Sequence, residues 1–457
     1  MKNTDTIAAI ASGLTSSGIG IVRISGPDAL EKISGIFKSS KGKNIDLCSC
    51  ESHTVHYGYI YDSDTAIDEV LVSVFKAPKS YTSEDTVEIN CHGGPFILNR
   101  VLKTVIDTGI RTADPGEFTK RAFLNGRIDL SEAQAVMDLI SSKNEYARRN
   151  ALGNIRGTLK NIILDIRNRL IHESAFIESA IDDPEHYSLE GYSESLDVIL
   201  TDIQAEIEKL VKSFEAGKLL SEGINCCIIG RPNVGKSSVF NALSGDEKAI
   251  VTDLPGTTRD FLDTCINYEG ITLNFIDTAG IHDTSDKIEL IGIDRAKELV
   301  QKSDIIIAVF DISEELSEED HRILSLCEGR NSLIVLNKSD LKHKLDAESF
   351  KDHEIIQTSV KTGEGIDEIL KHISDRFIRG NISFNDEVFI TNARQKELLK
   401  DALDSVRQVR KTIADGMSED FYTSDLMEAY HKLGEIIGEE AADDLVEVIF
   451  RDFCMGK

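Results

Sequence analysis

The stretch Gly230–Ser238 reads GRPNVGKSS and constrains the fold more than any other segment of the chain. It matches the pattern G-x-x-x-x-G-K-[ST], in which glycines let successive backbone N–H groups turn toward a phosphate chain at a helix N-terminus. The apolar run Ile224–Ile229 before it predicts a buried strand, and Ser238–Leu243 after it predicts a helix. This context favours a P-loop over a simple glycine-rich turn. We expect Lys236 to reach the β- and γ-phosphates and Ser237 to offer its hydroxyl to Mg²⁺.

Three later motifs, each placed after an apolar run, indicate that the nucleotide is a guanine nucleotide. Asp277 follows the expected strand Ile271–Ile276, where a carboxylate would sense a Mg²⁺-bound water and the γ-phosphate. Asp340 follows Leu333–Leu336 and can accept from both the exocyclic amine and the ring N–H of guanine, a pattern that adenine cannot present. Ser359–Lys361 would supply the last contact with the base. Each motif is weak alone, but the four together in this order predict GTP binding.

Length and charge limit the classes to which the chain can belong. Its 457 residues should hold about three domains. The net charge of −28 argues against a broad nonspecific hold on nucleic acid, because phosphate neutralisation supplies most of that affinity. If RNA is a substrate, a partner would therefore carry much of its backbone.

The cysteines and the ends of the chain indicate a cytoplasmic protein. Eight cysteines are scattered, the adjacent Cys226 and Cys227 lie in an expected core strand, and no secretory signal or long apolar span is present. The C-terminal Cys454-Met455-Gly456-Lys457 only superficially resembles a prenylation signal, since glycine and lysine do not suit it. We expect a reduced, soluble protein without a membrane anchor.

The first 115 residues alternate short β-like runs with turns and then form a helix, which predicts an α+β domain. The expected elements are the strands Gly20–Ser25, Thr54–Tyr61, Glu69–Phe75 and Thr86–Asn90 and a helix from about Pro95 to Asp107.

Two cysteine motifs in this region leave alternatives open. Cys48 and Cys50, with His53 and His56, could hold a metal, but their spacing fits no common zinc pattern and we prefer loop cysteines. The stretch Cys91–Gly94 closes a strand on two glycines, which allows either close approach of the backbone to a ligand or a tight turn.

From about Gly116 the hydrophobic period becomes helical. Ser131–Gln134 predicts a capping box for a helix whose inward residues would be Ala133, Val136, Met137 and Ile140. A second apolar stripe consists of Leu159, Ile162, Ile163, Ile166 and Leu170. Between Gly116 and Leu170 there are ten Lys and Arg against six Asp and Glu. We interpret this surplus as a solvated helix face rather than a nucleic-acid site.

The helical pattern resumes after the nucleotide region. Its two stripes are Leu399, Leu403, Val406 and Ile413, followed by Leu426, Ala429, Tyr430, Leu433 and Ile437. Neither helical half is large enough for a bundle alone, so we expect the halves to pack together with the nucleotide domain inserted between them. The expected division is an α+β domain (1–117), a first helical segment (118–218), a P-loop GTPase domain with a mixed sheet and helices on both faces (219–377), and a second helical segment with its CxGK tail (378–457).

Further motifs give the chain a full-length resemblance to the MnmE (TrmE) family of tRNA modification GTPases. They are Gly20–Gly26, Cys91–Pro95, Pro115–Thr119, Arg121–Gly126, the P-loop set, Gly256–Asp260 and Phe453–Lys457. The resemblance implies an N-terminal folate-binding domain that dimerises, a discontinuous helical domain and an inserted Ras-like GTPase domain. It also implies tRNA as substrate and a flavin-bearing partner, MnmG. With that partner the family adds a carboxymethylaminomethyl or aminomethyl group to carbon 5 of the wobble uridine, position 34, of certain tRNAs, using a tetrahydrofolate one-carbon unit.

The same resemblance assigns a folate site. It implies that Arg23, Glu88, Arg127 and Lys457 contact 5-formyl-tetrahydrofolate. Arg127 stands where a lysine is usual, which keeps the charge and changes its geometry. Cys454 would take part in the one-carbon chemistry.

For hydrolysis, the resemblance implies K⁺ in place of an arginine finger. The residue after Gly280 is Ile281, so the water-positioning glutamine of Ras-like switches is absent. The K⁺ ligands would be Asn233, Thr252, Leu254 and Thr257, the leucine through its carbonyl, and Thr258 would join Ser237 on Mg²⁺. Glu289 would orient the water, although it also reads as an exposed helix carboxylate, and His282 stands where the family often has arginine.

The complete GTP site expected from the motifs and the resemblance consists of Asn233, Val234, Gly235, Lys236, Ser237, Ser238, Thr252, Asp253, Leu254, Pro255, Gly256, Thr257, Thr258, Asp277, Thr278, Ala279, Gly280, Asn337, Lys338, Asp340, Ser359, Val360 and Lys361.

Two other functions fit the GTPase motifs. One is a GTP-dependent assembly switch, as in ribosome biogenesis, without covalent modification. The other is a folate enzyme that uses GTP only for regulation. Arg23, Glu88 and the terminal Cys-x-Gly-Lys have no purpose in an assembly switch, so they favour the modification enzyme.

Overall fold

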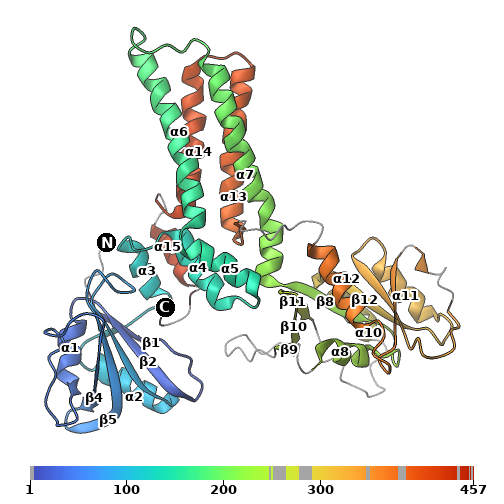
Figure 1. Ribbon diagram of the computed structural model, residues 1–457, viewed down its shortest axis with the longest axis horizontal. Helices are drawn as coiled ribbons and strands as arrows, with labels where there is room; N and C mark the ends of the chain where they lie inside the picture. The colour runs from blue at the N-terminus through green and yellow to red at the C-terminus, as the bar shows by residue number, and fades with distance from the viewer. Residues whose placement is uncertain are drawn as a thin grey trace. The chain divides into compact units, whose positions relative to one another are not determined.

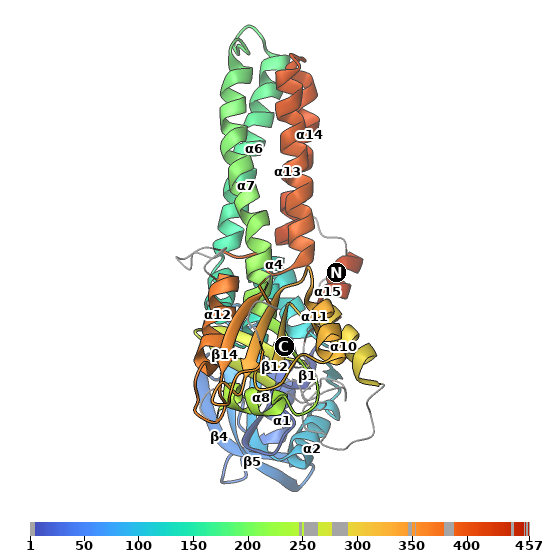
Figure 2. The same ribbon diagram turned by 90° about the vertical axis from the view of Figure 1, so that its right-hand side faces the viewer.

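The computed structural model describes residues 5–245, 249–250, 264–276, 291–345, 350–351, 353–378, 388–439, 443–451, 453 and 456 (Figure 1 and Figure 2). The chain forms two compact units. The first comprises Met1–Met137, Asn154–Thr201 and Asp401–Lys457, and the second comprises Asp138–Gly153 and Asp202–Lys400. Across the described residues, no helix combines the length and the apolar character that a membrane crossing needs.

The first unit is built on a mixed seven-stranded sheet of order β3-β4-β5-β6-β2-β1-β7. Its strands are β1 (Ile7–Ile10), β2 (Ser17–Ser25), β3 (Phe37–Lys38), β4 (Thr54–Asp62), β5 (Thr65–Phe75), β6 (Thr86–Gly93) and β7 (Arg111–Thr112). The buried face carries alternate residues such as Val70, Val72 and Val74 and packs against α1 (Ala29–Ile36) and α2 (Pro95–Ile106). The four expected strands and α2 are confirmed, whereas β1 and α1 were not predicted.

The helices of the first unit come from both helical stretches of the sequence. They include α3 (Glu117–Leu124), α4 (Leu130–Ser141), α6 (Thr158–Asp182), the beginning of α7 (Tyr192–Glu222), the end of α13 (Ala393–Ala414), α14 (Tyr422–Ile437) and α15 (Asp443–Arg451). Arg167 of α6 is 3% exposed, donates to the carbonyl of Tyr430 at 3.1 Å and pairs with Glu439. Helices α6 and α14 thus lie side by side, and the two stretches pack together as expected (Figure 1).

Two local predictions for α4 were wrong. The capping box is formed by Asp129 and Glu132, because the Asp129 carboxylate accepts from the Glu132 backbone N–H at 2.8 Å and the Glu132 carboxylate accepts from that of Asp129 at 2.7 Å. A carboxylate placed one residue before the helix satisfies its first N–H groups better than Ser131, whose hydroxyl instead donates to Asp129. Ile140, expected to face inward, is 44% exposed near the end of the helix.

The second unit is built on another mixed seven-stranded sheet, of order β14-β13-β12-β8-β11-β10-β9. Its strands are β8 (Ile224–Ile229), β9 (Ala249–Ile250), β10 (Thr264–Tyr268), β11 (Ile271–Phe275), β12 (Ile305–Asp311), β13 (Ser332–Asn337) and β14 (Glu354–Thr358). Its helices include α8 (Lys236–Ser244), α10 (Ile291–Lys302), α11 (Glu318–Cys327) and α12 (Ile366–Ile378). Five strands, β14 to β11, run parallel, so their carboxyl ends lie at one edge of the sheet.

A short segment from the first helical stretch belongs to the second unit. Asp138–Gly153, which includes most of α5 (Glu145–Ile155), contacts the β10–β11 hairpin. The side chain of Asn267 donates to the carbonyl of Lys143 at 2.9 Å, and that of Asn144 donates to the Thr272 hydroxyl at 3.2 Å. These bonds attach the segment to the sheet that carries the P-loop.

Candidate functional site

The P-loop connects β8 to α8 through a backbone that turns several times into the left-handed region. Asn233 has φ 65° and Gly235 has φ 101°, directly before α8 begins at Lys236. A Cβ atom on Gly235 would lie 2.3 Å from the side-chain nitrogen of Asn337, so this position requires glycine. The predicted strand, loop and helix are all present, with the helix starting two residues earlier than expected.

Lys236 lies within this loop. Its Nζ donates to the carbonyls of Gly230 and Arg231, both at 2.8 Å, and burial lowers its pKa. Because a buried ammonium group is stabilised by a nearby anion, a bound phosphate would favour the charged form of this lysine.

Asn337 and Lys338, at the end of β13, connect the expected base-recognition motif to the P-loop. The Asn337 amide donates to the carbonyl of Val234 at 2.9 Å, and Lys338 Nζ donates to that of Asn233 at 3.0 Å. Lys338 also pairs with Asp311. Burial opposes ionisation of Asp311, but hydrogen bonds from Lys338 and from Ser313 outweigh it and hold the pKa below its ordinary value. The two loops therefore form one connected structure.

Asp340, for which the motif predicts a contact with guanine, follows the strand β13. Its Oδ1 accepts a hydrogen bond from the hydroxyl of the buried Ser359 at 2.9 Å, and its Oδ2 lies 3.8 Å from the ammonium group of Lys361. These contacts, from the segment after β14, fix the direction of the carboxylate. Asp340, Ser359 and Lys361 are thus brought together as the sequence predicts.

Much of the phosphate and metal site lies outside the described residues. This applies to Thr252, Asp253, Leu254, Pro255, Gly256, Thr257, Thr258, Asp277, Thr278, Ala279, Gly280, Ile281, His282 and Glu289, and likewise to Cys454 and Lys457. Their roles stay predictions.

A second group of candidate residues lies in the first unit, on the strands β2 and β6. Arg23 and Glu88 are direct neighbours in the sheet, and the guanidinium donates to the carboxylate at 2.9 Å. Arg23 also donates to the carbonyl of Gly456 at 3.1 Å, so the last turn of the chain reaches this pair. Arg23 and Arg127 share one aromatic neighbour. The three expected folate residues Arg23, Glu88 and Arg127 therefore lie close together.

That neighbour is Tyr81, which sequence reasoning missed. The Cζ atoms of Arg23 and Arg127 lie 5.2 and 4.6 Å from the centre of its ring, and its hydroxyl lies 2.9 Å from that of Thr119. Arg23 lies 5.7 Å from the ring of Phe118 as well. A single tyrosine in a polar turn carries no periodic signal, which is why it was overlooked.

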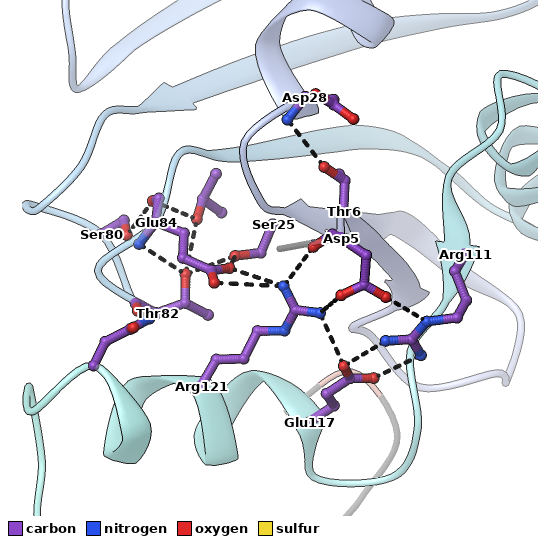
Figure 3. A network of polar contacts seen from close by, with 12 residues as sticks. Asp5, Thr6, Ser25, Asp28, Ser80, Thr82, Glu84, Arg111, Glu117 and Arg121 are labelled. Carbon is purple, nitrogen blue, oxygen red and sulfur yellow. Dashed lines mark hydrogen bonds and ion pairs between the residues drawn. The ribbon is translucent and has the colours of Figure 1, made fainter. Parts of the chain in front are cut away.

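A charge network is centred on the buried Arg121 (Figure 3). Arg121 of α3 is 1% exposed and pairs with Asp5, Glu84 and Glu117. Glu117 in turn accepts two hydrogen bonds from Arg111, at 2.7 and 3.0 Å. The network ties the loop after Ser80 to the start of the chain and to α3.

The motif Cys91–Gly94 forms a tight structure. A Cβ atom on Gly93 would lie 2.2 Å from the hydroxyl oxygen of Ser17, so two backbone segments approach closely there. Cys91 is buried in the core, and burial raises its pKa to about 11, which makes it unreactive. His92 is oriented by Asp68, 2.7 Å away.

The remaining candidates are structural among the residues that the structure describes. His, Cys, Asp and Glu form no group there that could hold a metal ion, including Cys48, Cys50, His53 and His56. The cations of the 116–170 stretch that have acidic partners are Lys120, Arg121, Arg148, Arg149, Lys160, Arg167 and Arg169. Arg121 and Arg167 are buried, whereas the other five cations lie at the surface, and those five pairs agree with a solvated helix face rather than a nucleic-acid site.

Comparison with known proteins gives two family matches. Residues 6–127 match the GTP-binding protein TrmE N-terminus, and residues 130–454 match the MnmE helical domain. A tRNA modification GTPase MnmE from Lachnoclostridium phytofermentans is 47% identical, covering 99% of this chain and 100% of the relative. One from Bacillus subtilis is 42% identical, with coverage of 99% and 100%. A solved G domain of the T. maritima FeoB iron transporter is 28% identical, covers 33% of this chain and 97% of that chain, and superposes with a TM-score of 0.26.

Proposed function

The chain belongs to the MnmE family of tRNA modification GTPases, and from this we propose that it hydrolyses GTP to GDP and phosphate in the course of tRNA modification. The proposed product is a carboxymethylaminomethyl or aminomethyl group on carbon 5 of the wobble uridine, position 34, of certain tRNAs. The one-carbon unit would come from tetrahydrofolate. The proposed partners are a flavoprotein of the MnmG type and a second copy of this chain, in the cytoplasm.

The nucleotide site supports the GTPase activity through its own residues. Lys236, with its lowered pKa and two carbonyl acceptors, would exchange those carbonyls for phosphate oxygens. Asp340, fixed by Ser359, would accept the two N–H groups of guanine.

The residues present also fit the two expected ions, as far as the structure describes them. Ser237 lies at the first turn of α8, where a hydroxyl group suits Mg²⁺. Asn233 projects from the P-loop at a positive φ angle and is exposed, so its amide oxygen is available to K⁺. Thr252, Leu254, Thr257 and Thr258 would complete the two sites, and Glu289 would orient the attacking water. K⁺ would supply positive charge as negative charge develops at the γ-phosphate.

The folate site fits its ligand by chemistry. Arg23, Glu88 and Arg127 combine donors, an acceptor and positive charge around an aromatic ring, which suits a ligand with a pterin and carboxylates. The observation that carries the proposed function is the bond from Arg23 to Gly456, since a GTP-dependent assembly switch gives no reason for the chain end to reach this pair. Lys457 directly follows Gly456, and Cys454 precedes it by two residues.

Nucleoside analysis of tRNA decides between the two functions. In cells that lack this protein, we expect unmodified carbon 5 at the wobble uridine, restored by the wild-type gene. A Lys236→Ala gene, which should lose GTP binding, is the matched control and should not restore it. An unchanged wobble uridine in the deletion strain would favour the assembly switch.

A further inference from the structure

Arg23 and Arg127 come from different elements, yet their guanidinium groups lie over the same ring. Two like charges at one place repel each other, so another group must hold them there. The π face of Tyr81 attracts both cations, at 5.2 and 4.6 Å.

The two arginines differ in charge balance. Arg23 is paired with Glu88 and bonded to Gly456, so this pair is neutral overall and offers both donors and an acceptor. Arg127 is exposed, and among the described residues its guanidinium has neither an acidic partner nor a hydrogen bond. Arg127 is therefore the uncompensated positive charge of the site, which a carboxylate would neutralise.

Tyr81 is held firmly in place. Its hydroxyl bonds to Thr119, a residue with no exposed surface. The following Thr82 bonds to the Ser25 hydroxyl at 2.6 Å and accepts at its carbonyl from the Asn125 amide at 2.7 Å. The Arg121 network shown in Figure 3 fixes the rest of this loop through Glu84. A rigid support of this kind is what a precisely placed ligand contact needs.

We propose that Tyr81 is a positioning residue that holds Arg127 as the receptor for a carboxylate at the glutamyl end of the folate, while the neutral Arg23–Glu88 pair faces the pterin end. The inference rests on the folate site proposed above. It assigns the ring of Tyr81, rather than its hydroxyl, to ligand binding.

Titration of 5-formyl-tetrahydrofolate against the full-length protein tests it. Tyr81→Leu should weaken binding by about tenfold, whereas Tyr81→Phe, which keeps the ring, should bind like the wild type. Tyr61→Leu is the matched control, because it removes a similar contact with Lys38 at 4.4 Å in the same sheet. In an Arg127→Gln background, Tyr81→Leu should not reduce the folate affinity further, because Tyr81 acts on the ligand through Arg127. An additional loss of the same size there would overturn the proposal.

A second ligand distinguishes binding of the pterin end of the folate from binding of its glutamyl end. A 5-formyl-tetrahydropterin without the glutamyl group should bind Tyr81→Leu and wild type equally, and an equal loss for both ligands would overturn the carboxylate assignment. If the wild type binds neither ligand, the proposed folate function and this ligand assignment both fail. The NMR signal of the Arg127 side-chain N–H still decides whether the ring holds Arg127: it should shift in Tyr81→Leu and stay in place in Tyr61→Leu. A circular dichroism spectrum and a thermal unfolding midpoint like those of the wild type show that each variant has folded.

Discussion

The guanidinium of Arg23 donates a hydrogen bond to the carbonyl of Gly456 at 3.1 Å, so strand β2 and the last turn of the chain meet at one point. The turn needs glycine there, because φ is 84° and a Cβ atom would lie 2.3 Å from the carbonyl oxygen of Ile10. The chain end is therefore fitted to the first sheet at the place where folate binding is proposed.

Deleting Gly456 and Lys457 should weaken 5-formyl-tetrahydrofolate binding by about tenfold or more, because Arg23 loses an acceptor and the ligand loses its proposed contact with Lys457. GTP affinity should not change, since the nucleotide site belongs to the other compact unit. Titrating both ligands against the truncated protein measures this. Unchanged folate affinity would place the tail outside the site and leave Cys454 without a reason to be near the one-carbon chemistry.

Asp340→Asn should reduce selectivity for GTP over other nucleotides by about 1–3 kcal/mol, because one acceptor proposed to face guanine becomes a donor. The bond from Ser359 shows that this carboxylate is already oriented in the protein. Competition binding with GTP, ATP and xanthosine triphosphate measures the change. Xanthosine triphosphate presents an acceptor at that position, so the variant should bind it more tightly than the wild type does. A variant with the wild-type preference would remove Asp340 from base recognition.

GTP hydrolysis should be faster in K⁺ than in Na⁺, because oxygen ligands spaced for the larger ion hold the smaller one poorly. Asn233→Ala should reduce the difference between the two salts, while Asn241→Ala, at an exposed position of the adjoining helix α8, serves as control. Phosphate release at equal ionic strength measures both rates. Equal rates in the wild type would contradict the K⁺ assignment.

The sequence placed the described loops of the candidate nucleotide site correctly because their positions depend on short distances along the chain. Each motif follows its own strand, so the apolar runs before Gly230, Asn337 and Ser359 placed these loops at the same sheet edge. The resemblance added Arg23, Glu88 and Arg127, which the structure brings together.

The remaining contacts could not be predicted because they join distant residues without any periodic pattern. Arg121 contacts Asp5, and Tyr81 contacts Arg23, across long stretches of chain. The capping residue of α4 was misassigned because Asp129 and Ser131 are both good caps, and only the geometry distinguishes them.

Arg121→Met should destabilise the first unit by about 1–3 kcal/mol, since the part-buried Glu84 loses its cation and Glu117 keeps only Arg111. Thermal unfolding measures this, with Arg148→Met as control, because Arg148 makes only an exposed pair with Glu145 and its loss should leave the midpoint unchanged. Equal midpoints for the wild type and Arg121→Met would contradict a stabilising role for the network.

The same network should make the stability of the first unit depend on pH. For Glu117, burial raises the pKa, but hydrogen bonds from Arg111, Asp114 and Arg121 outweigh it, so the pKa lies below its ordinary value of 4.5. A lowered folded-state pKa contributes stability above pH 4.5 that is lost as the pH falls through the folded value. Unfolding of the wild type between pH 6 and pH 3 should show this loss, and it should be smaller in Arg121→Met.

The bond from Asn267 to the carbonyl of Lys143 leads to the last prediction. The β10–β11 hairpin lies between residues 251–263 and 277–290, which hold the predicted phosphate and ion contacts. The hypothesis tested here is that nucleotide binding shifts the hairpin and that Asn267 passes the shift to the helical segment Asp138–Gly153. Asn267→Ala should lower tRNA modification severalfold while GTP hydrolysis stays near the wild-type rate.

Nucleoside analysis in complemented cells and phosphate release from the purified variant measure the two effects. Asn99→Ala is the matched control, because that asparagine also donates to a carbonyl, that of Pro95 at 2.8 Å, but within a single helix of the first unit. Tyr146 packs against Gly270 beside the Asn267 bond, where a Cβ atom would lie 2.4 Å from its ring, so the hairpin should stay folded in the variant. A parallel loss of hydrolysis and modification would mean that Asn267 only supports the fold. Loss of modification alone would mean that the hairpin carries the nucleotide signal to the helices.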